Sequence, residues 1–145
     1  MHRIRARVVS ILFLVIAMNA FAVDQPRSIP SDAADYQSVL AVAHDAVERH
    51  LGKPAALDVR QLQSLDDWAF LRAQMVGADG RPISYEGTSF ADSAKAGGVS
   101  PTYVALLRRD RGAWTIVVDR IGPTDVVWET WSKDYGAPAA LFESP

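Results

Sequence analysis

The chain has 145 residues, 15 of them basic and 17 acidic, and it contains no cysteine. Its net charge of −2 leaves no excess of basic residues, which argues against binding to nucleic acid or attachment to an anionic membrane surface. The lack of cysteine excludes disulfides. The length suits a single domain with one core.

Residues 1–22 have the pattern of a secretory signal peptide. Three arginines precede an apolar run over residues 8–18, and Ala20-Phe21-Ala22 supplies the small residues of a cleavage site. The run is shorter than the ~20 residues of a spanning helix, so we expect cleavage after Ala22 and no stable membrane insertion afterwards. Without a cysteine to carry a lipid or a disulfide, a bacterial periplasmic or secreted protein is the expected class.

An amphipathic helix is predicted after a short leader. Residues 23–30 contain two prolines and no apolar periodicity, which predicts a flexible leader before a single domain over residues 31–145. Ser31 or Asp32 is suited to cap the helix, and Gly52 ends it. One helical face carries the apolar residues Tyr36, Val39, Leu40, Ala43, Val47 and Leu51.

Two β-hairpins follow. Residues 57–65 and 68–76 are separated by Asp66-Asp67, and residues 102–109 and 113–121 are separated by a turn that ends in Gly112. The glycine-rich connection 77–101 is long enough to indicate a functional or partly ordered loop. Within it we expect a short helix capped by Ser89 and a brief edge strand at Ile83 and Tyr85.

The segment 121–138 predicts a short C-terminal helix. Gly122-Pro123 breaks the last strand, Thr124 or Asp125 is suited to cap the helix, and Gly136 ends it. Within that helix Trp128, Trp131 and Tyr135 form one aromatic stripe. We expect this stripe to act as a lid that closes one end of the core.

These elements predict an α+β fold. One long N-terminal helix packs on a four-stranded antiparallel sheet, and the short C-terminal helix is the lid. The order of one helix followed by four strands resembles the cystatin-like architecture, in which a curved sheet wraps a helix. That likeness concerns element order and carries no activity.

Candidate catalytic and metal-binding residues are few. His44 and Glu48 share a helix face, but His50 lies on the apolar arc, so the three do not converge on one ion. No cysteine and no G-x-S-x-G elbow accompanies a histidine. We therefore expect no metal, no cofactor and no catalytic residue.

Carboxylate pairs and tryptophans leave two alternatives open. Asp66 with Asp67, or Asp119 with Asp125, are the remaining acid and base candidates, although turn and cap roles also explain them. Two tryptophans, Trp68 and Trp114, each begin a strand. They form either a stacking platform for a sugar or peptide, or part of the core.

Four stretches, DDWAFLRAQM, RPISYEG, YVALLRRDRGAWTIV and IGPTDVVWETWSKDYGAPAALF, resemble a group of small exported bacterial proteins of unknown function. The most specific of these is the Ile-Gly-Pro-Thr-Asp-Val-x-Trp motif at residues 121–128. The resemblance covers nearly all of residues 57–142. It implies export and the α+β fold, and it implies no catalytic residue.

The leading functional hypothesis is a non-enzymatic binding or interaction domain of the cell envelope, whose partner is an envelope protein, a peptide or a glycan. Its expected contact surface consists of Tyr85, Glu86 and Phe90 in the long loop, with Trp128, Trp131 and Asp125 in the C-terminal segment. The alternative is a small hydrolase or ligand-binding protein with a pocket in a curved sheet, lined by Asp119, Asp125 or His44. A purely structural envelope protein is a third possibility.

Overall fold

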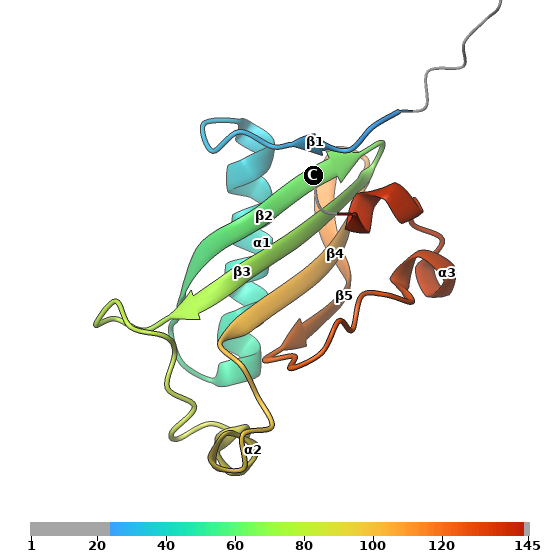
Figure 1. Cartoon of the computed structure of the whole chain (residues 1–145). Helices are drawn as coiled ribbons and strands as arrows, with labels where there is room; N and C mark the ends of the chain where they lie inside the picture. The colour runs from blue at the N-terminus through green and yellow to red at the C-terminus, as the bar shows by residue number, and fades with distance from the viewer. Residues whose placement is uncertain (1–23, 144–145) are drawn as a thin grey trace, which may run out of the picture.

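A computed structural model describes residues 24–143, so the predicted signal peptide lies outside the described residues. The elements in chain order are β1 (Arg27–Ser28), α1 (Ala34–Leu51), β2 (Ala56–Leu65), β3 (Trp68–Val76), α2 (Ala91–Lys95), β4 (Thr102–Asp110), β5 (Ala113–Ile121), α3 (Trp131–Tyr135) and the 3₁₀ helix η1 (Ala139–Phe142). The strands form one antiparallel sheet in the order β1-β2-β3-β4-β5 (Figure 1). The predicted α+β class and antiparallel sheet are confirmed.

The sheet has five strands, so the prediction of four is wrong by one. Arg27 pairs with Ser64 and Ser28 pairs with Gln63, which adds β1 to the edge of β2. The backbone N–H of Ile29 then donates to the carbonyl of Leu62 at 3.1 Å. A strand of two residues shows no side-chain alternation, which is why the sequence pattern placed it in the leader.

The helix α1 follows the predicted pattern except at its start. The residue before its first turn is Ala33, which has no side chain that could accept a hydrogen bond, so neither Ser31 nor Asp32 caps the helix. The predicted end at Gly52 is confirmed. This residue has a φ of 68°, and its N–H donates to the carbonyl of Glu48 at 2.8 Å.

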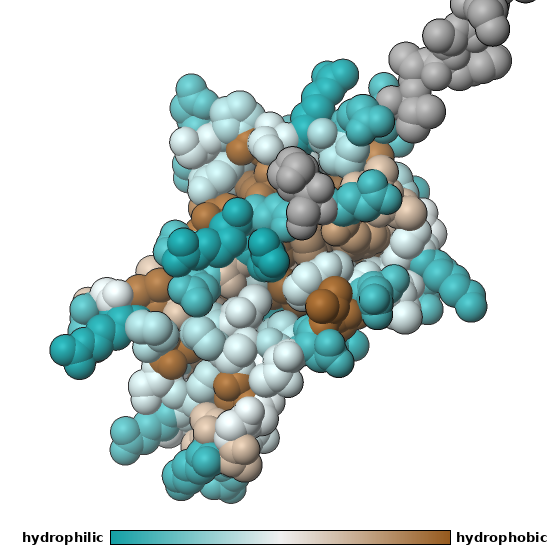
Figure 2. Space-filling view, in the orientation of Figure 1, coloured by the Kyte–Doolittle hydropathy of each residue, from teal (hydrophilic) through white to brown (hydrophobic). Residues whose placement is uncertain are grey.

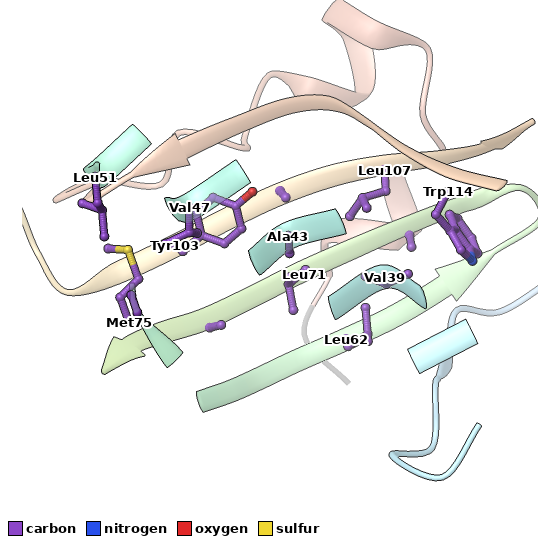
Figure 3. Packing of buried hydrophobic residues seen from close by; sticks show 14 of the residues in the cluster. Val39, Ala43, Val47, Leu51, Leu62, Leu71, Met75, Tyr103, Leu107 and Trp114 are labelled. Carbon is purple, nitrogen blue, oxygen red and sulfur yellow. The ribbon is translucent and has the colours of Figure 1, made fainter. Parts of the chain in front are cut away.

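One face of the sheet, which we call the inner face, packs against α1 (Figures 1 and 3). Because side chains alternate along a strand, every second residue of β3 and β4 points toward the helix. Leu71 and Tyr103 from the sheet meet Ala43 and Val47 from the helix, and all four are fully buried. This is the main core.

The opposite face, which we call the outer face, carries a second, smaller core under the C-terminal segment. The Phe70 ring lies 5.6 Å from the Trp128 ring and 6.4 Å from the Trp131 ring, centroid to centroid. Trp131 and Leu141 are buried there. The segment therefore covers part of a sheet face. The prediction that it closes one end of the main core is wrong.

The local predictions for this segment and for the long loop need two further corrections. The helix α3 contains only residues 131–135, so Trp128 precedes it and Tyr135, 37% exposed, completes no buried stripe. In the loop, α2 follows Phe90 without a side-chain cap from Ser89, and the expected edge strand is reduced to one bridge between Val76 and Pro82. Short helices form here through tertiary packing and not through capping signals.

Candidate functional site

The outer face divides into a covered part and an open part. The covered part holds apolar side chains from adjacent strands, among them Phe70, Leu106 and Val118, which lie in register under the C-terminal segment. Further along the same strands the side chains on this face become polar. Figure 2 shows the open part in teal and white beside the C-terminal segment, with hydrophobic residues in brown confined to smaller patches.

Two shallow hollows, of about 280 and 270 Å³, meet on the open part at Arg72 and Thr102. We call them together the polar groove; its main lining residues are Arg60, Arg72, Gln74, Thr102, Asp125 and Trp128. The floor comes from β2, β3 and β4, where Gln61 is the register partner of Arg72, and Gln74 that of Thr102. The wall is the segment that leaves β5.

The two arginines of the polar groove differ in their partners. Arg60 is neutralised, because its Nη2 lies 2.7 Å from a carboxylate oxygen of Asp58, and it also donates to the Gln74 amide oxygen at 3.1 Å. Arg72 forms no ion pair with any residue in the range 24–143. Its Nε and the Nε2 of its neighbour Gln61 are buried, and neither has a hydrogen-bond partner among these residues.

The wall is held by the Ile-Gly-Pro-Thr motif. Gly122 has a φ of 63°, and a Cβ there would lie 2.8 Å from the Val99 side chain and 2.9 Å from the Tyr85 hydroxyl. The N–H of Gly122 donates to Thr102, and the Ser100 hydroxyl donates to the Pro123 carbonyl at 2.6 Å. A glycine is therefore needed where the chain turns from β5 onto the outer face.

A second polar cluster lies on the inner face, at the C-terminal end of α1. His50 Nε2 is 3.1 Å from Asp119 Oδ2, and the Tyr103 hydroxyl donates to the same oxygen at 2.9 Å. Burial raises the pKa of Tyr103 far above its usual value, and the adjacent Asp119 carboxylate raises it further. The phenol therefore stays protonated and serves as a donor. Together with His50 it satisfies a mostly buried carboxylate.

The predicted pairing of acidic residues is not observed. Asp119 binds His50 on the inner face, whereas Asp125 lines the polar groove on the outer face and accepts from the Val126 N–H at 2.8 Å. Asp66 and Asp67 form the β2–β3 turn. Asp67 approaches Arg109 at 3.6 Å, so the turn role accounts for this pair.

No group of three histidine or acidic side chains in residues 24–143 is arranged to hold a metal ion. His44, half-buried on α1, is joined to Glu48 by no hydrogen bond or ion pair found in that range. The helix spacing that brings the two onto one face therefore builds no site by itself.

Trp68 and Trp114 lie at the same end of the sheet but on opposite faces, so they form no common platform. Trp114 is buried on the inner face, and its Nε1 donates to Asp35 of α1 at 3.2 Å. Trp68 packs at the outer core, with the Arg108 guanidinium 5.1 Å from its ring centroid. Each ring thus has its own local partners.

The aromatic residues of the long loop are packed inward. Tyr85 is 7% exposed, its hydroxyl donates to the Ser100 carbonyl, and its ring lies 5.9 Å from the ring of Phe90. Burial raises the pKa of Tyr85 to about 12. Glu86 is exposed, and its carbonyl accepts from Lys53 Nζ at 3.1 Å. Of the three loop residues, Glu86 alone is exposed.

Sequence reasoning placed Asp125 and Trp128 at a contact surface, and the structure puts both in the lining of the polar groove. It did not single out Arg72, Gln61, Gln74 or Thr102. A signal existed, since Gln61 and Gln63 in β2, and Arg72 and Gln74 in β3, recur with the period of two that marks one sheet face. What the sequence does not tell is where on that face the cover ends.

Within residues 24–143 no helix is both long and apolar enough to span a membrane. Comparison with known proteins gives no match, since no family model, no curated protein and no solved structure matches the chain. The assignment of function therefore rests on the geometry of the residues themselves.

Proposed function

We propose that this chain is an exported, non-enzymatic binding domain of the bacterial cell envelope, and that the polar groove is its contact surface. The observation that carries the proposal is the open part of the outer face, where two joined hollows lie between polar strand residues and Trp128. The Arg72 guanidinium in these hollows forms no ion pair within residues 24–143. Arginine and aromatic side chains together are typical of contact surfaces, which supports binding of a further molecule there.

Export is supported by the sequence pattern of residues 1–22 and by the resemblance of residues 121–128 to a motif of small exported bacterial proteins. An envelope protein, a peptide or a glycan is the class of partner that an exported domain meets. Sequencing the N-terminus of the chain recovered from the periplasm or the medium tests this part, and we expect it to begin at Val23.

Site-specific photocrosslinking in the bacterium that makes the chain tests the contact surface. A benzophenone side chain at Gln74 lies in the polar groove, one at Glu86 lies on the exposed part of the long loop, and one at Asp45 lies on the solvent side of α1. We expect a discrete crosslinked product from Gln74 and none from Asp45. Products from Glu86 alone would move the surface to the loop, and equal products from all three would refute it.

A second candidate function, a small hydrolase, is favoured by one observation only. The His50 and Asp119 side chains are paired, as in sites where a carboxylate orients a histidine base. However, within residues 24–143 no serine or threonine hydroxyl bonds to His50. Hydrolysis of 4-nitrophenyl acetate by the chain and by His50→Gln tests this candidate. Equal rates exclude it, and a rate lost in the variant supports it.

A further inference from the structure

The polar groove also indicates the chemistry of its ligand, an inference that rests on the proposed binding function. Three of its lining side chains have groups that form no hydrogen bond with another described residue: the hydroxyls of Thr102 and Thr124 and the amide nitrogen of Gln74. Thr124 is exposed, and of the described residues that are not exposed only Gln61 and Arg72 have an enclosed polar side-chain atom without a partner. The three groups therefore meet solvent, where a ligand can reach them.

These groups match a ligand that both donates and accepts hydrogen bonds. The Gln74 amide nitrogen donates, the Asp125 carboxylate accepts, and a threonine hydroxyl does either. Asp125 is exposed, and its Oδ1 accepts from the adjacent Val126 N–H at 2.8 Å, while its Oδ2 accepts from no other described residue. Because each sugar hydroxyl is a donor and an acceptor at once, a row of hydroxyls can satisfy this mixed set.

The charges of the polar groove balance one another. Arg60 is paired with Asp58 at 2.7 Å, and the positive Arg72 lies in the same hollow as the negative Asp125. An anion in this hollow is repelled by Asp125, and a cation is repelled by Arg72. With two positive and two negative groups, the surface has no excess charge that would select an ion. It therefore favours a neutral ligand.

Trp128 gives the polar groove an apolar surface suited to a sugar ring. Its ring packs on Phe70 at a centroid distance of 5.6 Å, and the half-buried residue also lines the hollow that contains Thr102 and Asp125. The C–H groups of a sugar ring form a flat apolar face that packs on an aromatic ring, while the hydroxyls at its rim bond to polar side chains. The contact with Phe70 holds Trp128 in place for such stacking.

A polypeptide fits this surface less well. Extended peptides bind a sheet mainly through main-chain hydrogen bonds to an edge strand. The strands β3 and β4 under the polar groove have hydrogen-bonded neighbours on both sides, so their backbone groups are already paired. We propose that the polar groove binds a neutral oligosaccharide, which stacks one ring on Trp128 and bonds through its hydroxyls to Asp125 and Thr102. Because the two hollows join at Thr102, the next sugar reaches Gln74.

The test is a titration of the purified, ¹⁵N-labelled chain, followed through two side-chain signals in NMR. The indole N–H of Trp128 and the amide of Gln74 are assigned by their absence in Trp128→Leu and Gln74→Met. The probes are neutral trimers of glucose, of mannose and of N-acetylglucosamine, each tested alone. A galacturonate trimer and a blocked pentapeptide of serine and glutamine complete the set.

We expect a neutral trimer to shift both signals, with the blocked peptide at least about tenfold weaker. The affinity should stay within about twofold between low and high salt, because no ionic contact is screened. Read through the Gln74 signal, Trp128→Leu should weaken binding about tenfold, and Asp125→Asn several-fold. The matched controls are Trp68→Leu, at the other end of the outer face, and Asp134→Asn, on the exposed side of α3. Both should leave the affinity within about twofold.

Tighter binding of the galacturonate trimer or the peptide than of every neutral trimer would overturn the proposal, as would equal binding by Trp128→Leu and Trp68→Leu. If Trp128→Leu fails to fold, the comparison of Asp125→Asn with Asp134→Asn still decides, because both carboxylates are on exposed residues. A crosslink from Gln74 combined with no shift by any neutral trimer would refute this ligand class alone. Absence of both the crosslink and the shift would refute the binding function as well.

Discussion

The two faces of the sheet are covered by different elements and to different extents. On the inner face α1 runs along the strands, and alternate residues of β3 such as Leu71 and Met75 are fully buried beneath it. On the outer face the cover is a short irregular segment, and it reaches only the half of the strands that carries Phe70 and Leu106. A complete cover stabilises the fold, and an incomplete one leaves polar side chains available for contact.

The boundary on the outer face is sharp because it follows the register. Two residues along β3 separate Phe70, which lies under the aromatic cover, from Arg72, which lines the polar groove. Since alternate residues share a face, one step along that face is enough to pass from an apolar to a polar environment. The covered part should therefore respond to substitution as a core, and the open part as a surface.

Trp131→Ala should have the largest effect on stability. The ring is 3% exposed and contacts Phe70 and Phe142, so its removal leaves a large cavity and should cost about 3 to 5 kcal/mol of unfolding free energy. Urea denaturation followed by tryptophan fluorescence measures the loss. Tyr135→Ala, at the exposed end of the same helix, is the control and should cost less than about 1 kcal/mol. A similar loss of unfolding free energy in both variants would mean that the C-terminal segment does not form a packed core on the outer face.

Gly122→Ala should have the next largest effect, because Gly122 holds the boundary between the covered and open parts. The residue has a positive φ, and an added Cβ meets the Val99 side chain at 2.8 Å, so we expect a loss of about 2 kcal/mol or more. Gly80→Ala, at an exposed turn with positive φ but free space around it, isolates the backbone strain. If both variants lose the same stability, the close packing contributes nothing.

The buried tyrosines of the main core should lower the unfolding free energy of the chain in alkaline solution. Tyr85 has its pKa raised to about 12 and Tyr103 also has a raised pKa, whereas an unfolded tyrosine titrates near 10. A raised folded pKa gives stability that is complete below pH ~10 and lost as the pH rises further. At pH 11 each tyrosine should cost about 1 kcal/mol relative to pH 8.

Urea denaturation at pH 8 and pH 11 measures this loss. Tyr85→Phe loses stability at pH 8 with its hydrogen bond to Ser100, but its pH dependence should be smaller by about 1 kcal/mol. An unchanged pH dependence in Tyr85→Phe and in Tyr103→Phe would show that these phenols ionise freely in the folded chain.

Arg72→Gln should have the smallest effect, a change within about 0.5 kcal/mol or a small gain in stability. Arg72 has no ion pair to lose within residues 24–143, and one of its nitrogens is buried without a partner. Arg109→Gln is the contrasting variant, since Arg109 bonds Asp35 at 3.0 Å and lies over the Trp114 ring. Urea denaturation of both variants measures the two losses of unfolding free energy. A larger loss in Arg72→Gln than in Arg109→Gln would show that Arg72 stabilises the fold.

The sequence pattern predicted the elements whose signals are local. The apolar arc of α1, its end at Gly52, the four long strands and both hairpin turns all appear where the residues indicate, because periodicity and turn geometry are set within a few neighbours. It also placed Trp128 and Asp125 at a surface that the structure assigns to the polar groove. The predicted N-caps of α1 and α2 were wrong, because packing fixes the starts of these helices without side-chain capping.

What only the tertiary structure decided is how the faces are used. The strand β1 exists because its two residues meet the edge of β2, and Trp131 is buried because its segment folds back over Phe70. The sequence shows that Gln61 and Arg72 are polar strand residues, but it does not show that they are register partners with one buried nitrogen each that has no hydrogen-bond partner within residues 24–143. Burial and hydrogen-bond satisfaction depend on residues distant in the chain. For this reason the sequence by itself determined the elements, and their packing decided which part of the sheet stays open.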